Sequence, residues 1–123
     1  MSTIKYTEDH EWLRVDGDDV VTVGITNYAQ DALGDIVFVQ LPEIGATIAA
    51  GDEAAVIESV KAAGELKMPL AGTILEVNQA LADAPAMANT DPMGEGWFLR
   101  IRLDNPAVLS ELLDQTAYDK LIG

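Results

Sequence analysis

Lys61 is the residue of this sequence that is best placed to carry chemistry. It stands in the run Glu58-Ser59-Val60-Lys61-Ala62-Ala63, between two short apolar runs at 54–57 and 66–70. Two strand-like runs that flank a few residues predict a β-hairpin, and Lys61 falls at its bend, where a chain reaches furthest into solvent. A protruding lysine can be the attachment point of a covalent swinging arm, because acylation removes the charge of its amine. The simpler interpretation is a solvated turn lysine, which is the usual state of this residue.

The bend does not have the sequence of a tight two-residue hairpin turn. Such a turn places residues at positive φ and favours Asn-Gly or Asp-Gly, whereas Val60 is β-branched. The bend must therefore use a geometry that Val60 and Lys61 both tolerate, and the sequence leaves that geometry open.

Few other side chains could support chemistry of the protein's own. The chain of 123 residues has no cysteine, which excludes thiol catalysis, disulfides and cysteine-ligated metals. His10 is its one histidine, so a histidine-cluster metal site is excluded and any Ser-His-Asp triad would have to include His10. We interpret His10 as a strand-start residue hydrogen-bonded to the backbone. These observations favour a non-catalytic carrier whose reactive groups belong to a cofactor.

The charge of the chain restricts its partners. Twenty-one acidic residues against seven basic ones give a net charge of −14, which repels nucleic acid and anionic membranes. The same charge favours docking onto basic protein surfaces, or simply keeps the protein soluble. No stretch approaches the roughly 20 apolar residues of a membrane helix. The N-terminus has no signal or transit peptide, so we expect a bacterial cytoplasm, or a mitochondrial matrix only if a leader was removed.

Short strands dominate the elements that would position Lys61. Alternating apolar residues and β-branched runs predict strands at 11–16, 20–25, 35–41, 73–77 and 97–103. In the last of these, Phe98 is placed on the polar side with Arg100 and Arg102. Residues 78–89 are predicted to be a loop. The pattern is typical of a small β-sandwich or flattened barrel with peripheral helices.

Two segments begin or end with residues that are typical of helix termini. Residues 26–34 open with capping residues and close on glycine, which predicts a short helix with Tyr28, Ala32 and Leu33 on its inner face. The pair Asn105-Pro106 predicts the start of a second helix, and its apolar stripe would consist of Leu109, Leu112 and Leu113. Thr116 is a possible cap for a last turn.

The run Glu58-Ser59-Val60-Lys61-Ala62 resembles the lipoylation motif of the glycine cleavage system H protein family. The resemblance covers nearly the whole chain, because further blocks follow in the order of that family. These blocks are Tyr6-Thr7-Glu8-Asp9-His10-Glu11-Trp12, Val23-Gly24-Ile25-Thr26-Asn27-Tyr28-Ala29-Gln30, Leu33-Gly34-Asp35-Ile36-Val37-Phe38-Val39, Leu41-Pro42-Glu43-Ile44-Gly45, Gly72-Thr73-Ile74-Leu75-Glu76-Val77-Asn78 and Gly94-Glu95-Gly96-Trp97.

The resemblance implies a mainly β fold, a lipoyl/biotinyl-like barrel-sandwich hybrid of two sheets with a peripheral short helix and a C-terminal helix. It implies a single, monomeric lipoyl-carrier domain over residues 1–123, with its core at about 20–103 and a C-terminal helical segment at 105–122. Lipoate would be amide-linked to Lys61.

The partners that the resemblance implies are the enzymes of glycine cleavage. The carrier would move the aminomethyl group of glycine from a PLP-dependent glycine decarboxylase to a tetrahydrofolate-dependent aminomethyltransferase. It would then pass electrons to a dihydrolipoamide dehydrogenase. A lipoate ligase or octanoyltransferase would modify Lys61.

Secondary site residues follow from the same resemblance. Glu58 and Gly45 match family positions that are linked to recognition by the lipoylating enzyme. The arm in this family can fold back into a surface cleft, and the matching residues here are Glu11, Leu33, Ala62 and Glu65. The chain departs from the family at Ala63-Gly64-Glu65-Leu66, at Met93 and at Ala32, where a Ser-Asp-Leu-like run, an aromatic and, in some members, a polar residue are usual.

Other functions stay open at this point. The chain could donate lipoyl groups in a relay to other complexes, alone or in addition to glycine cleavage. It could also be an unmodified acidic β interaction module, in which case Lys61 would carry no adduct. A biotin carrier fits less well, because the lysine of that family lies between two methionines and here lies between Val60 and Ala62.

Overall fold

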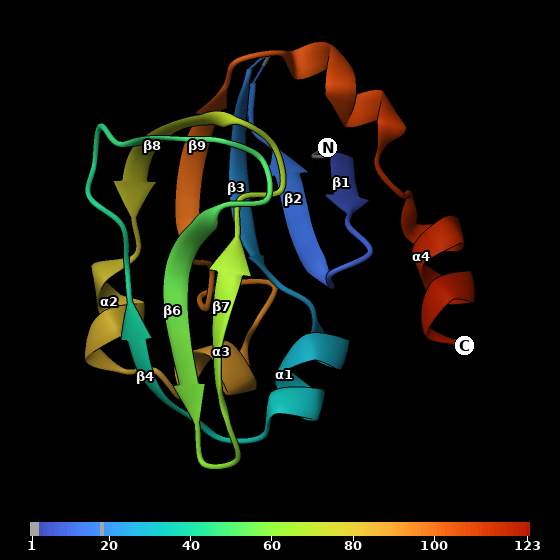
Figure 1. Cartoon of the computed structure of the whole chain (residues 1–123). Helices are drawn as coiled ribbons and strands as arrows, with labels where there is room; N and C mark the ends of the chain where they lie inside the picture. Colours follow the sequence, from blue (N-terminus) through green and yellow to red (C-terminus); the bar gives the residue numbers. More distant parts are fainter. Residues whose placement is uncertain (1–2, 18) are drawn as a thin grey trace.

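The computed structural model describes residues 3–17 and 19–123, which fold into two antiparallel β-sheets with short helices at their edges (Figure 1). The six-stranded sheet has the order β1-β2-β3-β9-β8-β5. Its strands are β1 (Thr3–Tyr6), β2 (Glu11–Val15), β3 (Val20–Ile25), β9 (Leu99–Leu103), β8 (Gly72–Val77) and β5 (Thr47–Ile48). The three-stranded sheet has the order β4-β6-β7, with β4 (Ile36–Gln40), β6 (Glu53–Ser59) and β7 (Ala63–Lys67).

The hydrophobic core lies between the two sheets, because buried side chains come from the strands of both. Full burial of such a side chain contributes roughly 1.5–3 kcal/mol to stability. The fully or nearly fully buried members include Leu13, Val21, Val23, Ile57, Leu66, Ile74, Leu99 and Ile101. This arrangement confirms the predicted mainly β fold of two sheets with peripheral helices.

The strand predictions hold with four corrections. β5 was not predicted. The second strand of the hairpin, expected at 66–70, is β7 at Ala63–Lys67, and it ends before Pro69, which has no amide hydrogen to donate to a ladder. β1 was not predicted, and it extends the sheet by pairing antiparallel with β2. The strand predicted at 97–103 begins only at Leu99, and Phe98 is fully buried rather than on the polar side. Phe98 precedes the pleated strand and bonds through its amide to the carbonyl of Val23 at 2.8 Å, so the alternation of β9 does not extend back to it.

The first helix, α1 (Asn27–Leu33), forms where it was predicted. The hydroxyl of Thr26 accepts from the amide of Ala29 at 3.3 Å, and Gly34 follows the last turn with φ of 78°. The predicted inner face was wrong in part, since Ala29 and Leu33 pack against the core whereas Ala32 is exposed and Tyr28 is 46% exposed. The row of this helix that packs against the core therefore consists of Ala29 and Leu33, and this row and the row of Tyr28 and Ala32 both border a cleft.

The loop predicted at 78–89 was wrong, since this stretch contains two short helices. They are α2 (Gln79–Asp83) and α3 (Met87–Thr90). Alanine-rich sequence favours helix, and each helix buries one side chain completely, Leu81 in α2 and Ala88 in α3. Tertiary anchoring of a single residue is enough to set one helical turn here.

The C-terminal segment also differs from the prediction. Residues Pro106–Glu111 form a 3₁₀ helix, and the α-helix that follows is α4 (Gln115–Ile122). Asp114, rather than Thr116, caps α4, because its carboxylate accepts from the amide of Ala117 at 2.8 Å. α4 lies beside β1 (Figure 1), and the ring of Tyr118 stacks on that of Tyr6 with centroids 4.6 Å apart. These rings and Trp12 form a second, smaller buried cluster.

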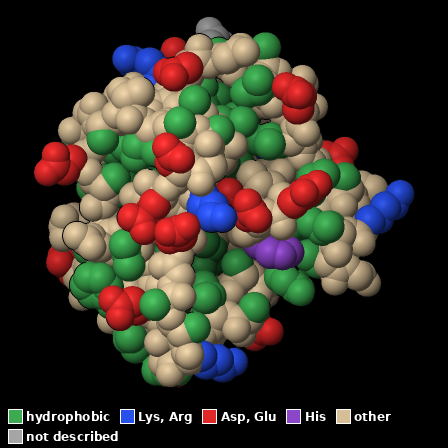
Figure 2. Space-filling model, in the orientation of Figure 1, with side chains coloured by type: hydrophobic (Ala, Val, Ile, Leu, Met, Phe, Trp, Pro, Cys, Tyr) green, Lys and Arg blue, Asp and Glu red, His purple; other side chains and the backbone are tan. Residues whose placement is uncertain are grey.

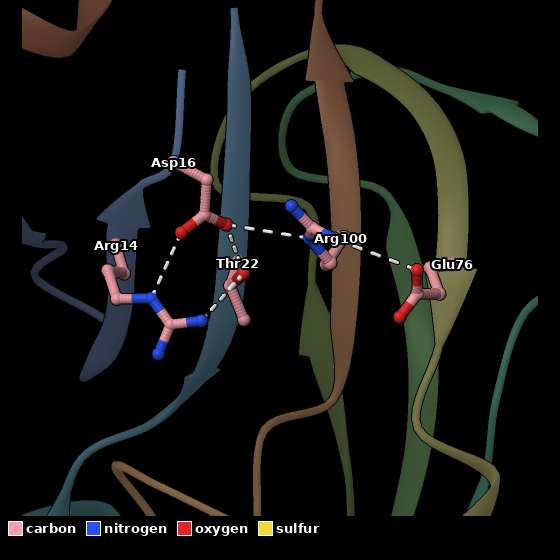
Figure 3. A network of polar contacts seen from close by, with 5 residues as sticks. All are labelled: Arg14, Asp16, Thr22, Glu76 and Arg100. Carbon is pink, nitrogen blue, oxygen red and sulfur yellow. Dashed lines mark hydrogen bonds and ion pairs between the residues drawn. The ribbon is translucent and has the colours of Figure 1, made fainter. Parts of the chain in front are cut away.

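An ionic network crosses β3, β9 and β8 and is centred on Asp16, next to the end of β2 (Figure 3). Asp16 pairs with the Nε atoms of Arg14 at 3.0 Å and Arg100 at 3.5 Å, and it accepts a hydrogen bond from Thr22. Arg100 also approaches Glu76, at 3.6 Å. Burial alone would raise the pKa of Asp16, but the hydrogen bonds from Thr22 and Arg14 and the charges of both arginines outweigh it and hold the pKa below its usual value.

Replacing Asp16 with asparagine is expected to lower stability at pH 7 by about 1 kcal/mol, after allowance for solvent screening of the pairs. The pKa of Asp16 is lower in the folded protein than its unfolded value of 3.8, so its charged form stabilises the fold above pH 3.8. This stabilisation disappears as the pH falls through the folded-state pKa. Urea unfolding at pH 7 and pH 3 should therefore show a loss at pH 7 that shrinks at pH 3. Asp104→Asn, an exposed residue outside the network, serves as the control. Equal losses of unfolding free energy at both pH values would show that the stabilisation by Asp16 is not ionic.

Candidate functional site

Lys61 lies at the end of the β6–β7 hairpin, furthest from the connections that join this hairpin to the rest of the chain (Figure 1). Its side chain is exposed, and the neighbouring Val60 is 66% exposed. The two strands pair antiparallel in continuous register from Ala55 to Glu58, next to the bend, and the register shifts only at the far end, between Glu53 and Ala55. The position predicted for Lys61 from the sequence is confirmed.

The geometry of the bend depends on Ser59, which the sequence analysis did not single out. The Ser59 hydroxyl accepts from the amides of Lys61 at 3.2 Å and Ala62 at 3.1 Å. The Ser59 amide donates to the carbonyl of Ala62 at 2.8 Å. Among the described residues other than glycine, only His10 has a positive φ, so Val60 and Lys61 avoid the left-handed region as expected. A serine that bonds to the backbone two residues onward is a known turn-former, and that signal was available in the sequence.

A surface cleft of about 250 Å³ opens between α1 and β7. It brings together three of the four residues matched to the family's arm cleft, namely Glu11, Leu33 and Glu65. Apolar side chains of Ile25, Ala29, Ile57 and Leu66 also line it. The fourth matched residue, Ala62, lies in the turn next to Lys61 and is not among the lining residues, so its assignment to the cleft is corrected. The cleft can thus receive a group that is apolar along its length and polar at its end.

Glu11 is the buried charge of this cleft. Its side chain is only 3% exposed, and one carboxylate oxygen accepts from the hydroxyl of Thr7 at 3.0 Å. Burial raises the pKa of Glu11 from 4.5 to about 7, and the negative charge of Asp9 adds to this effect. The hydrogen bond from Thr7 and the backbone and charge of Lys67 act in the opposite direction. Near neutral pH this carboxyl group is therefore divided between its neutral and its charged form, and a cation placed beside it would favour the charged form.

His10 and Tyr28 form one wall of the cleft, with ring centroids 4.5 Å apart. His10 has φ of 66°, and its Nδ1 atom is hydrogen-bonded to the hydroxyl of Tyr118 at 2.9 Å. The Tyr118 hydroxyl, in turn, lies 2.6 Å from that of Thr26. The expected hydrogen bonds of His10 to the backbone are confirmed for its main chain, because its amide donates to the carbonyl of Thr7 at 3.1 Å and its carbonyl accepts from the amide of Thr26 at 3.0 Å. Its side chain, however, bonds to Tyr118 of α4, which was not expected.

The two residues matched to lipoylation recognition lie far apart, one in the hairpin and one outside it. Glu58 is exposed on β6, in register with Phe38 of β4 and Ala63 of β7. Gly45, with φ of 92°, lies in the connection between β4 and β5, which joins the opposite end of these strands (Figure 1). Its amide donates to the carbonyl of Ile74 at 2.7 Å. The structure therefore places Glu58 near Lys61 and Gly45 away from it.

Acidic side chains outnumber basic ones on the face of the molecule shown in Figure 2, in line with the net charge of −14. Within the described ranges 3–17 and 19–123, no three histidine or acidic side chains are grouped to hold a metal ion. The described helices are also all too short or too polar to cross a membrane.

The fold places this protein in a known structural class. A crystal structure of a glycine cleavage system H protein from Mycobacterium marinum superposes with a TM-score of 0.89 and 42% sequence identity. The match covers 98% of this chain and 97% of that one. The class is that of mainly β proteins with two antiparallel sheets, short helices and a C-terminal helix.

The sequence comparisons then identify the family. The family model described as "Glycine cleavage H-protein" matches residues 4–123. A glycine cleavage system H protein of Rhodospirillum rubrum is 55% identical over 100% of this chain and 98% of its own length. The H protein 1 of Pseudomonas aeruginosa is 58% identical, over 100% and 96%. The chain belongs to the glycine cleavage H-protein family, which carries lipoate and serves the glycine cleavage system.

Proposed function

We propose that this protein is the lipoyl carrier of the glycine cleavage system and that lipoate is attached through an amide bond to Lys61. The observation that carries the proposal is the position of Lys61 at the exposed end of the β6–β7 hairpin. The other lysines, Lys5, Lys67 and Lys120, lie within β1, β7 and α4. A modifying enzyme that requires a bend can therefore select Lys61 by shape.

When bound, lipoate supplies a disulfide that accepts an aminomethyl group and two electrons. In the proposed cycle, a glycine decarboxylase delivers the aminomethyl group and an aminomethyltransferase removes it. A dihydrolipoamide dehydrogenase then collects the electrons. The chain itself contributes no catalytic residue to this cycle and acts as a mobile substrate of all three enzymes, in a bacterial cytoplasm.

The cleft between α1 and β7 protects the cargo between encounters. Leu33 and its apolar neighbours take up the hydrocarbon of the arm and exclude water. The carboxylate of Glu11 pairs with the ammonium of the aminomethyl group, with Glu65 at the rim of the same cleft. Loss of the cargo to water would waste it as ammonia and formaldehyde.

Recognition of the hairpin by the lipoylating enzyme involves Glu58 and Gly45. Because Gly45 lies at the opposite end of β4 and β6 from Lys61, an enzyme that uses both residues must cover the length of the hairpin. The strongly acidic surface favours partners that carry basic residues around the docking site.

Incubation with lipoate, ATP and a lipoate ligase, followed by peptide mass spectrometry, tests the attachment site. A lipoyl group on Lys61, and on no other lysine, supports the proposal. A folded protein that remains unmodified contradicts it and leaves the acidic interaction module as the alternative. An adduct on another lysine contradicts the assignment to Lys61.

A further inference from the structure

The side chain of Lys61 lies against Gly34, the residue that ends α1. A Cβ atom built on Gly34 would lie 3.1 Å from Cε of Lys61, 3.4 Å from Cδ and 3.6 Å from Cγ. Three successive carbons of the lysine therefore pass position 34 at contact distance, and Cε comes closer to a Cβ there than an ordinary contact allows. An exposed lysine is usually surrounded by solvent, so this contact is a specific feature of the bend.

Both partners of this contact are held in place. The side-chain amide nitrogen of Asn89, in α3, donates to the carbonyl of Gly34 at 2.9 Å, and its oxygen accepts from the amide of Ile36 at 2.8 Å. The amide of Val60 donates to the carbonyl of Asp35 at 3.0 Å, which ties the lysine turn to the same segment. The connection between α1 and β4 and the β6–β7 turn therefore lie side by side (Figure 1).

We propose that Gly34 is a positioning residue: it is a seat across which the Lys61 side chain is directed toward the cleft between α1 and β7. The inference rests on the proposed function and specifies how the arm finds its cleft. Leu33, immediately before Gly34, lines the cleft on one side, and Gly64 and Glu65, shortly after Lys61, line it on the other. An arm that leaves over Gly34 starts between these two walls, whereas an arm that projected into solvent would have to search for them.

Glycine is required at this position for two separable reasons. Its φ of 78° and ψ of −162° lie in a region that side-chain-bearing residues avoid. In addition, a methyl group would lie 3.1 Å from Cε of Lys61, so the flexible end of the lysine would have to move by a few tenths of an ångström. The first effect lowers the stability of the fold, and the second changes only the direction of the arm.

Gly51 provides a matched control that separates the two effects. It also has a positive φ, of 85°, but a Cβ atom there would meet nothing within 4 Å. It precedes β6, at the opposite end of the hairpin from Lys61. Gly34→Ala and Gly51→Ala should therefore both lower thermal stability, while only Gly34→Ala should change the arm.

The first measurement uses the unmodified protein and needs no lipoate. Nuclear Overhauser contacts between the Lys61 methylenes and the Gly34 α protons are expected in wild type, and the same contacts in Gly51→Ala. In Gly34→Ala the contacts between the Lys61 Cε protons and the α proton of residue 34 should weaken, because Cε has to move away from the new methyl group. Absence of these contacts in wild type overturns the seat, even if Lys61 proves to be lipoylated.

The second measurement uses protein lipoylated on Lys61 and loaded with glycine by a glycine decarboxylase that is then removed. Ordering a flexible side chain changes an equilibrium by roughly a factor of two to ten, so ammonia release should be faster by about that factor in Gly34→Ala and unchanged in Gly51→Ala. Equal release in all three proteins overturns the inference but not the carrier function. Failure to lipoylate wild type overturns the carrier function while the first measurement still stands. If Gly34→Ala does not fold, Asn89→Ala gives the same test, because it frees the Gly34 segment without adding a methyl group. Unchanged Lys61–Gly34 contacts and unchanged ammonia release in Asn89→Ala would count against the seat.

Discussion

Replacement of Lys61 with arginine is expected to abolish lipoylation and, with it, all activity of a reconstituted glycine cleavage system. Arginine keeps the positive charge and the length of the side chain, but its guanidinium does not lose a proton at neutral pH and so offers no amine to acylate. The residue is exposed and makes no side-chain hydrogen bond within the described part of the chain, so the fold should not change. Intact mass after ligase treatment and glycine-dependent NAD reduction measure the two losses.

The lysine of α4 provides the control for this experiment. Lys120→Arg makes the same chemical change at an exposed position in the last turn of α4. It should be lipoylated at the wild-type rate and support full activity. A lipoyl adduct on the Lys61→Arg protein, or activity without an adduct, would refute the assignment of the arm to Lys61.

Replacement of Glu11 with glutamine is expected to shorten the lifetime of the aminomethyl cargo by about 10- to 100-fold, because a hydrogen bond to a charged group contributes roughly 1.5–3 kcal/mol. Glutamine preserves the size of the side chain and removes only its charge. In wild type, retention should weaken as the pH falls and Glu11 takes up a proton, and it should do so below the pKa of about 7 of the empty cleft, because the ammonium of the cargo favours the charged form. In Glu11→Gln this pH dependence should be absent. Ammonia release from loaded protein, followed from pH 5 to pH 8, tests both statements.

The same substitution should have the opposite effect on stability. Glu11 has a pKa of about 7 in the folded protein against 4.5 when unfolded, so the folded state binds the extra proton and loses stability as the pH rises from 4.5 to 7. A shift of this size corresponds to about 3 kcal/mol. Glu11→Gln should therefore be more stable than wild type at pH 8 and similar to it at pH 4.5. Glu43→Gln, at an exposed position, should show neither effect. If Glu11→Gln is less stable at pH 8, the carboxylate is better solvated than its burial indicates.

The hairpin and most strands could be predicted because their determinants are local. Apolar and polar residues alternate along β9, β3 is rich in β-branched residues, and the β6–β7 bend lies between two apolar runs. α1 carries its own start at Thr26 and its own end at Gly34. The segment 78–89 was missed because its helices are too short for a periodic pattern and depend on the burial of Leu81 and Ala88.

The cleft could be predicted only in part. The resemblance brought Glu11, Leu33 and Glu65 together, and the structure agrees. The wall formed by His10 and Tyr28 could not be derived from local sequence. It depends on the positive φ of His10 and on the hydroxyl of Tyr118, which lies 108 residues further along the chain.

This long-range contact has a consequence for the order in which the molecule matures. The β6–β7 hairpin closes over a few residues, whereas the contact of His10 with Tyr118 closes across 108 residues. Contacts that are distant in sequence carry the larger entropic penalty of loop closure and form later in folding. We therefore expect the proposed attachment site to be complete before the cleft. On the proposed function, a newly made chain would present Lys61 for modification first and acquire the capacity to protect an unstable cargo last, once α4 has docked.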